Sequence, residues 1–162
     1  MAGKDGKNNR TALETAYAYL ANRMRTVHET EQHLRGKGYT EEEITEAIND
    51  LIGLRYLDDY QYALRYYEYN REKRRGTMRA ARELAEKGVD DETVRNARED
   101  FIYSSGIDEF EDALDIAKRE LELRNIEPGD ADEKTSASIA RKLENRGFAR
   151  DIIFKVLGRI RN

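Results

Sequence analysis

The sequence lacks cysteine and tryptophan, and it has only one proline and two histidines among its 162 residues. Without cysteine there is no disulfide, no thiolate metal site and no thiol nucleophile, so the chain needs no oxidising compartment. The longest apolar run, residues 16–21, is far too short to cross a bilayer. Because no apolar signal segment follows the first residues, we expect a cytoplasmic protein that makes no membrane contact.

Apolar residues are also scarce, at 38% of the chain, and charged residues make up another 38%. Globular proteins average roughly 45–50% apolar and about 25% charged residues, so this composition disfavours one large round core. The 10 tyrosines and 4 phenylalanines argue against disorder. We therefore expect an elongated array of small units, each with a buried apolar stripe, after a polar, disordered tail at residues 1–10.

Three similar stretches recur along the chain, at residues 34–39, 84–89 and 143–148. Each contains a leucine, two variable residues, a basic residue, a glycine and an apolar or aromatic residue. Glycine after a basic residue is typical of the left-handed position that ends a helix. Polar starters such as Thr40-Glu-Glu-Glu43 then begin the next helix with a capping box. The stretches therefore predict a helix end and a restart in each of three repeats.

The apolar spacing predicts helices throughout and no strand. The nine predicted helices cover residues 11–25, 27–36, 41–54, 59–73, 77–87, 91–104, 108–124, 132–146 and 149–161. Grouped in threes, they give an all-α tandem array of three three-helix, helix-turn-helix-like repeats. The predicted limits are residues 11–57 for repeat one, 58–106 for repeat two and 107–162 for repeat three.

No constellation of side chains indicates catalysis or a metal site. The two histidines, His28 and His33, are five residues apart, so they do not face one metal as histidines four apart on a helix do. The pair Asp58-Asp59 either acts as a carboxylate pair or caps a helix, and we favour capping. We expect no enzyme activity, no metal and no cofactor.

Charge is unevenly distributed along a chain whose net charge is −4. Residues 65–89 contain 8 basic and 4 acidic residues, residues 90–133 contain 5 and 16, and residues 134–162 contain 8 and 2. Two basic blocks thus flank an acidic one. This pattern indicates either a patterned interaction surface or solvated helix faces.

Tyrosine and arginine are concentrated between residues 60 and 75. A helical wheel gives this segment two stripes, which are Tyr62, Tyr66 and Tyr69 on one side and Tyr60, Leu64, Tyr67 and Arg71 on the other. Only one stripe can face its own repeat. The other either packs against the next repeat or forms an exposed aromatic and basic surface, which suits single-stranded nucleic acid or a protein partner.

An ordered set of motifs adds to the repeat pattern. They are Thr26-x-x-Glu29, Lys37-Gly38, Gly53-Leu-Arg-Tyr-Leu57-Asp58-Asp59, Tyr62-Ala63, Tyr66, Arg75-Gly76, Glu83-Leu84, Lys87-Gly88 and Arg146-Gly147-Phe148. In this order, and over about residues 16–160, they resemble the RecX family, the regulatory proteins of the RecA recombinase.

The resemblance implies an elongated, curved, right-handed solenoid of three repeats. It also implies a monomeric, non-enzymatic regulator that lodges in the groove of the RecA–single-stranded DNA filament. Such a protein lowers RecA ATP hydrolysis, strand exchange and the coprotease activity behind the SOS response, and so acts in recombination and DNA repair. The family pattern further implies that Tyr62, Ala63 and Tyr66 are core positions, which leaves the other stripe as a candidate surface.

We predict that contact with the filament or its DNA involves Tyr60, Leu64, Tyr67, Arg71, Arg74, Arg75, Arg79, Arg82, Arg146 and Arg150. Two alternatives remain open. The chain is either a helix-turn-helix-type module that binds single- or double-stranded DNA directly through its basic surfaces, or a scaffold for another protein with the acidic residues 90–133 as its docking face.

Overall fold

The computed structural model describes residues 9–161, and within them nine α-helices follow one another with no strand. The helices are α1 Ala12–Leu20, α2 Val27–Gly36, α3 Glu41–Gly53, α4 Asp59–Glu72, α5 Thr77–Glu86, α6 Asp91–Ser105, α7 Glu109–Leu123, α8 Glu133–Arg146 and α9 Arg150–Arg161. The prediction of an all-α chain is confirmed. Residues 1–8 of the predicted tail lie outside the described residues.

The helix starts follow from local side-chain chemistry. A capping box begins each of α1, α2 and α3, formed by Thr11 with Glu14, Thr26 with Glu29 and Thr40 with Glu43. The predicted first helix, residues 11–25, is too long, because α1 ends at Leu20. Thr26 takes an extended backbone, with φ −77° and ψ 162°, in order to cap α2, and the residues just before it therefore leave the helical conformation.

The repeated glycines behave as their sequence context predicts. Gly38, Gly88 and Gly147 have φ values of 89°, 83° and 87°, which is the left-handed region. An L-residue with a Cβ atom is strained in this conformation, whereas glycine is not. Each glycine ends one helix and turns the chain toward the start of the third helix of its group.

The buried apolar residues form three separate clusters, each drawn from three consecutive helices. We call these groups repeat one (α1–α3), repeat two (α4–α6) and repeat three (α7–α9). The largest fully buried side chains include Leu34 and Leu51 in repeat one, Tyr67 and Leu84 in repeat two, and Leu121 and Leu143 in repeat three. All extensive helix-to-helix packing also lies inside a repeat. The residue limits of the repeats stay a prediction.

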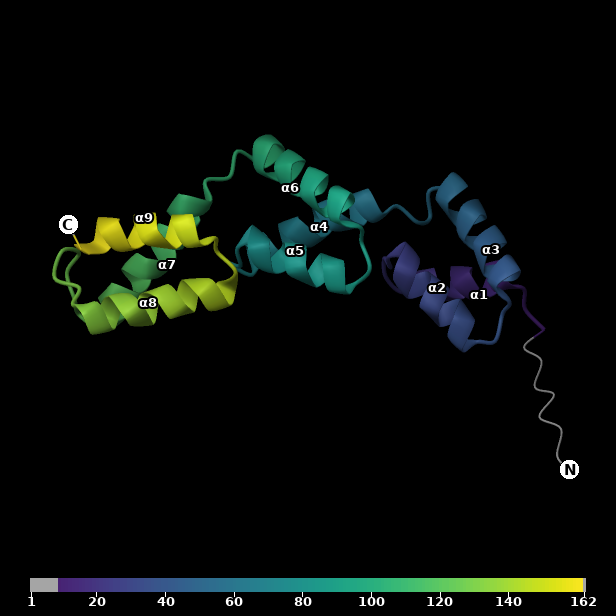
Figure 1. Cartoon of the computed structure of the whole chain (residues 1–162), viewed down its shortest axis with the longest axis horizontal. Helices are drawn as coiled ribbons and strands as arrows, with labels where there is room; N and C mark the ends of the chain where they lie inside the picture. The colour runs from purple at the N-terminus through teal and green to yellow at the C-terminus, as the bar shows by residue number, and fades with distance from the viewer. Residues whose placement is uncertain (1–8, 162) are drawn as a thin grey trace, which may run out of the picture.

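The repeats follow one another along the long axis and form an arch (Figure 1). The second helices of the repeats, α2, α5 and α8, lie along its lower, concave edge, and the third helices, α3, α6 and α9, lie along its upper edge (Figure 1). None of the helices in residues 9–161 has the length and apolar content that a membrane span needs.

Candidate partner-binding groove

Cations gather in a groove between repeats two and three. The groove has a volume of about 580 Å³, and its lining is Lys73, Arg75, Arg79, Ser138, Arg141, Lys142, Asn145 and Arg146. No carboxylate is among these side chains. The cations come from the segment that joins α4 to α5, from α5 and from the second half of α8, so the two basic blocks of the sequence meet here in space.

Hydrogen bonds to backbone carbonyls hold the two sides of this groove together. The Gly76 amide donates to the Arg146 carbonyl at 2.8 Å, and Arg146 Nη1 donates to the Arg74 carbonyl at 3.0 Å. A Cβ atom at Gly76 would lie 2.3 Å from the Gly147 carbonyl oxygen, which is too short for any real contact. Glycine at position 76 therefore allows α5 and the end of α8 to approach each other.

The cations of the groove differ in how they are neutralised. Arg79 Nε pairs with Glu83 Oε1 at 2.8 Å, and Lys142 pairs with Glu120. Within residues 9–161, Lys73, Arg75 and Arg141 form no ion pair. Arg146 likewise forms no ion pair among these residues, and its guanidinium donates only to a backbone carbonyl. Four unneutralised cations in one concave site favour an anionic ligand, because their charges add in the same small volume.

Arg75 also lines a second, smaller cleft of about 200 Å³ beside the groove. There it meets Arg71, Arg74 and three carboxylates, which are Glu72, Asp112 and Asp115. Arg71 Nε lies 3.4 Å from Asp112 Oδ2. Because its charges are mixed, this cleft is a weaker candidate for binding an anion than the groove.

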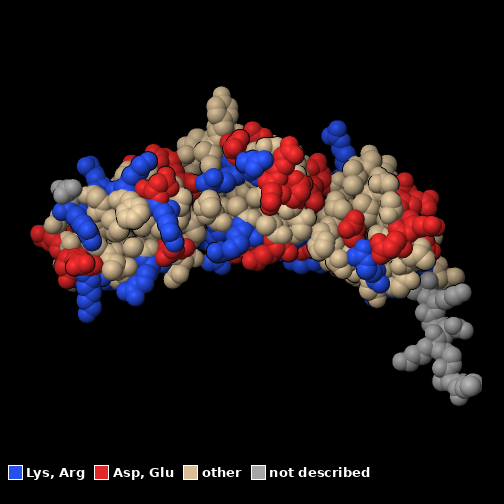
Figure 2. Space-filling view, in the orientation of Figure 1, with Lys and Arg blue, Asp and Glu red and all other residues tan. Residues whose placement is uncertain are grey.

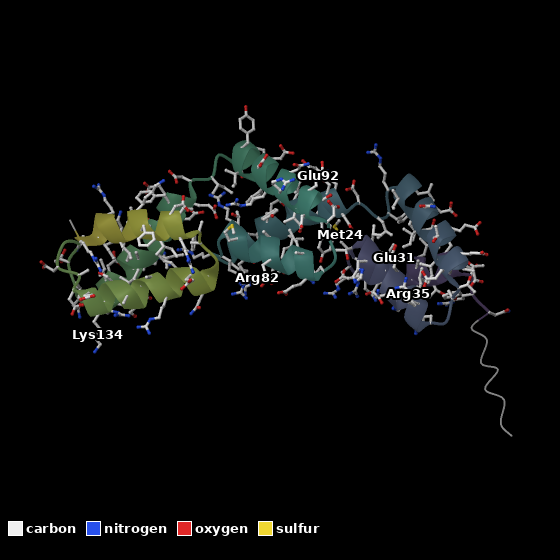
Figure 3. The ribbon with its side chains drawn as sticks, viewed as in Figure 1. Met24, Glu31, Arg35, Arg82, Glu92 and Lys134 are labelled. Carbon is white, nitrogen blue, oxygen red and sulfur yellow. The ribbon has the colours of Figure 1, made fainter. Side chains whose placement is uncertain are left out.

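The predicted arginines are only partly brought together. Arg75, Arg79 and Arg146 line the groove, and Arg71 and Arg74 line the adjacent cleft. Arg82 is exposed on α5 at the lower edge (Figure 3). Arg150 is exposed at the start of α9, and neither arginine lines the groove. Whether any of them contacts a partner stays a prediction.

Three of the groove cations, Lys73, Arg141 and Lys142, were not predicted from the sequence. Lys73 is far in sequence from the neighbouring pair Arg141 and Lys142, and only the packing of repeat three on repeat two brings them together. The available signal was the second basic block, residues 134–162, with 8 basic and 2 acidic residues. Figure 2 shows lysines and arginines along the lower edge of the arch near α5, and carboxylates over α3 and α6.

The predicted role of Tyr67 as a contact residue is wrong. Its side chain is 1% exposed, and its hydroxyl donates to the Val94 carbonyl at 3.0 Å in the core of repeat two. Tyr67 cannot reach a partner without unfolding that repeat. Tyr60 and Leu64 are half-buried and pack against the same core.

The opposite stripe of α4 forms a partly exposed tyrosine ladder. The Tyr62 and Tyr66 rings lie 6.0 Å apart and nearly parallel, and Tyr69 lies 6.2 Å beyond. Of the core positions implied by the resemblance, only Ala63 is fully buried. Burial and a hydrogen bond to Glu83 raise the pKa of Tyr66 to about 12.

One lysine, Lys73, contacts both the tyrosine ladder and the groove. Lys73 Nζ lies 5.7 Å from the centre of the Tyr69 ring, and Lys73 also lines the groove. The aromatic and basic surface that the sequence predicted in this segment therefore exists, but it is built on the stripe opposite to the one chosen.

The fold defines a small helical-repeat protein with a cationic groove between its second and third repeats. Residues 12–51 match the family model described as RecX, first three-helix domain. A protein of Vibrio parahaemolyticus named regulatory protein RecX is 31% identical over 143 residues, which are 88% of this chain and 87% of that protein. The chain belongs to the RecX family.

Other relatives agree in sequence and in fold. The regulatory protein RecX of Bacillus licheniformis is 33% identical over 154 residues, which are 94% of this chain and 56% of that protein. The chain thus spans little more than half the length of the Bacillus relatives. The crystal structure of RecX from Lactobacillus salivarius matches with a TM-score of 0.78 at 26% identity, covering 92% of this chain and 94% of that one.

Proposed function

We propose that this chain binds the RecA–single-stranded DNA filament and lowers its ATP hydrolysis, strand exchange and coprotease activity. Membership of the RecX family supports the proposal, and the cationic groove between repeats two and three is the observation that carries it. A filament of protein on DNA presents phosphates and carboxylates at regular intervals. An arched protein with a cationic groove can contact several of them at once, and weak contacts made together give useful affinity.

RecA ATP hydrolysis on single-stranded DNA, measured while this chain is titrated in, tests the proposal. We expect hydrolysis to fall at less than one chain per RecA monomer, because one arched chain contacts more than one subunit. No fall, with a chain that is helical by circular dichroism and with several RecA proteins tried, would contradict the proposal.

The groove is tested by reversing two of its unpaired cations, with Lys73→Glu and Arg141→Glu in one chain. Hydrogen bonds to charged groups contribute about 1.5–3 kcal/mol, so the concentration for half-inhibition should rise roughly tenfold or more. Arg79 and Arg146 are less suitable, since both also hold the junction together. The matched control is Arg65→Glu with Arg95→Glu, which reverses two exposed cations outside the groove. Equal inhibition by both double variants would exclude the groove as the contact.

Direct binding of single-stranded DNA is the second candidate, favoured by the tyrosine ladder beside the groove. Aromatic faces stack on bases while cations contact phosphates. Fluorescence anisotropy with a labelled oligonucleotide and no RecA distinguishes the two functions. Tight binding that weakens steeply with salt would favour this candidate.

A further inference from the structure

Neighbouring repeats share no apolar core that would fix the angle between them. The three buried clusters fall within residues 12–57, 63–101 and 113–160, and no cluster crosses a junction. The extensive helix pairs are likewise all inside a repeat. Contacts outside the three cores therefore hold each repeat at its angle to the next.

The same polar contact occurs at both junctions. The first amide of α2, at Val27, donates to Asp59 Oδ1 at 2.9 Å, and the first amide of α5, at Thr77, donates to Glu109 Oε1 at 2.8 Å. In both cases the acceptor is the first residue of the next repeat's first helix. The free amides at a helix N-terminus form strong hydrogen bonds with carboxylates. Each acid therefore ties one repeat to the second helix of the repeat before it.

These two acids are distinct from the residues that cap their own helices. The caps are Asp58, which accepts from the Gln61 amide at 3.0 Å, and Asp108, which accepts from the Phe110 amide at 2.9 Å. Asp59 and Glu109 follow the caps directly, and their oxygens point across the junction instead. A role confined to the local helix does not account for that direction.

The second junction has further bonds to the same acid. Glu109 Oε2 accepts from the Thr77 hydroxyl at 3.0 Å and lies 3.5 Å from Arg98 Nη2. The carboxylate thus meets two groups of α5 and one of α6, all in repeat two. In repeat one the corresponding first helical residue is Ala12, which packs into its own core.

We propose that Asp59 and Glu109 are positioning residues that fix the angle between adjacent repeats, and hence the curvature of the array. Each acts at its own junction. Removing one acid should loosen that junction while the helices and the three cores stay intact. The inference concerns the chain alone, so its test needs no RecA and can fail independently of the proposed function.

The absence of cysteine makes a direct distance measurement possible. Cysteines for spin labels replace one exposed residue in the third helix of each repeat, at Glu42, Glu92 and Lys155. Glu92 lies on α6 at the upper edge of the arch, away from the groove (Figure 3). Double electron–electron resonance on the pair 42/92 reports the first junction, and on the pair 92/155 the second.

Asp59→Ala should broaden the 42/92 distance distribution and leave 92/155 unchanged, and Glu109→Ala should do the reverse. Loss of a hydrogen bond to a charged group corresponds to a roughly ten- to hundredfold larger population of loosened junctions. Asp59→Asn and Glu109→Gln retain an acceptor oxygen and should restore most of the narrow distribution. Glu68→Ala and Glu111→Ala are matched controls, because both are exposed acids on the same two helices.

Three results would overturn the proposal. The first is a pair of alanine variants with unchanged distributions, and the second is a single variant that broadens both label pairs equally. The third is a loss of helical circular dichroism in an alanine variant that also occurs in the corresponding Asn or Gln variant. The acid would then stabilise the fold of a repeat and not the angle between repeats.

Discussion

The three repeated glycines allow backbone strain to be separated from crowding at the junctions. All three have left-handed φ values, but their surroundings differ. A Cβ atom on Gly38 would meet nothing within 4 Å, whereas on Gly147 it would lie 2.1 Å from the Arg79 Cβ and 2.7 Å from the Arg79 nitrogen. On Gly88 it would lie 2.3 Å from the His28 Cβ.

Alanine at each glycine should therefore give graded effects. Gly38→Ala should cost only the left-handed conformation, about 1–2 kcal/mol. Gly88→Ala should cost more, because the crowded His28 Cβ is fixed to α2 and no rotation of the side chain relieves the clash. Gly147→Ala should cost the most, because one of its close neighbours is the backbone of α5, which cannot move without shifting repeat two.

Urea unfolding followed by circular dichroism at 222 nm measures these costs. The Gly38→Ala variant supplies the baseline, so the difference between it and the other two isolates the crowding at each junction. Gly147→Ala should also weaken the proposed inhibition of RecA, since it displaces one side of the groove, while Gly38→Ala should not. Three equal free-energy changes would refute the reasoning, because they would mean that the close approach of the repeats contributes nothing.

Two further predictions concern single side chains. Burial raises the pKa of Tyr67 to about 12, as it does for Tyr66, whereas an unfolded tyrosine titrates near 10. The folded chain thus favours the neutral phenols. The stability that this preference contributes is fully present below about pH 10 and should be lost as the pH rises toward 12. Phenolate absorbance at 295 nm and circular dichroism, followed along one titration, check this. Thr26→Ala should destabilise the chain in thermal unfolding by about 1–2 kcal/mol more than Thr11→Ala. The buried Thr26 hydroxyl caps α2 and also donates to the Lys87 carbonyl across the first junction at 2.8 Å, whereas the Thr11 hydroxyl only caps α1.

Local structure was largely predictable from the sequence, because its causes are local. The capping box at Thr40 and the left-handed glycines each depend on residues a few positions apart. Eight of the nine helices lie within one residue of the predicted bounds at each end. The exception is α1, which ends at Leu20, five residues before the predicted end.

The side-chain pattern of α4 was harder to predict. The helical wheel separated two stripes correctly, but both carry tyrosines, so hydrophobicity alone could not choose the buried one. The choice depends on partners in other helices. Tyr67 is buried because Phe101 stacks on it at 5.6 Å and because the Val94 carbonyl accepts its hydroxyl.

The contacts between repeats were the least predictable part of the fold. A pair of acids at 58 and 59 reads as a helix cap, and Asp58 is one. Nothing in the sequence marks Asp59 as the acceptor of an amide that lies 32 residues earlier. The same holds for the groove, whose cations from residues 73–79 and 141–146 meet only after the second junction forms.

Separate cores joined by polar contacts predict how the chain unfolds. If each core is its own cooperative unit, a cavity made in one repeat should leave the others protected, as in arrays where stability adds from unit to unit. Leu121 is fully buried in the core of repeat three, so Leu121→Ala should cost about 2–5 kcal/mol there. Hydrogen exchange measured by mass spectrometry should then show faster exchange in α7–α9 and unchanged exchange in α1–α3, with repeat two affected only near the second junction. Faster exchange throughout the chain would mean that the junctions couple the three cores strongly. The acids Asp59 and Glu109 and the glycines Gly88 and Gly147 would then transmit as much stability between repeats as a continuous apolar core would.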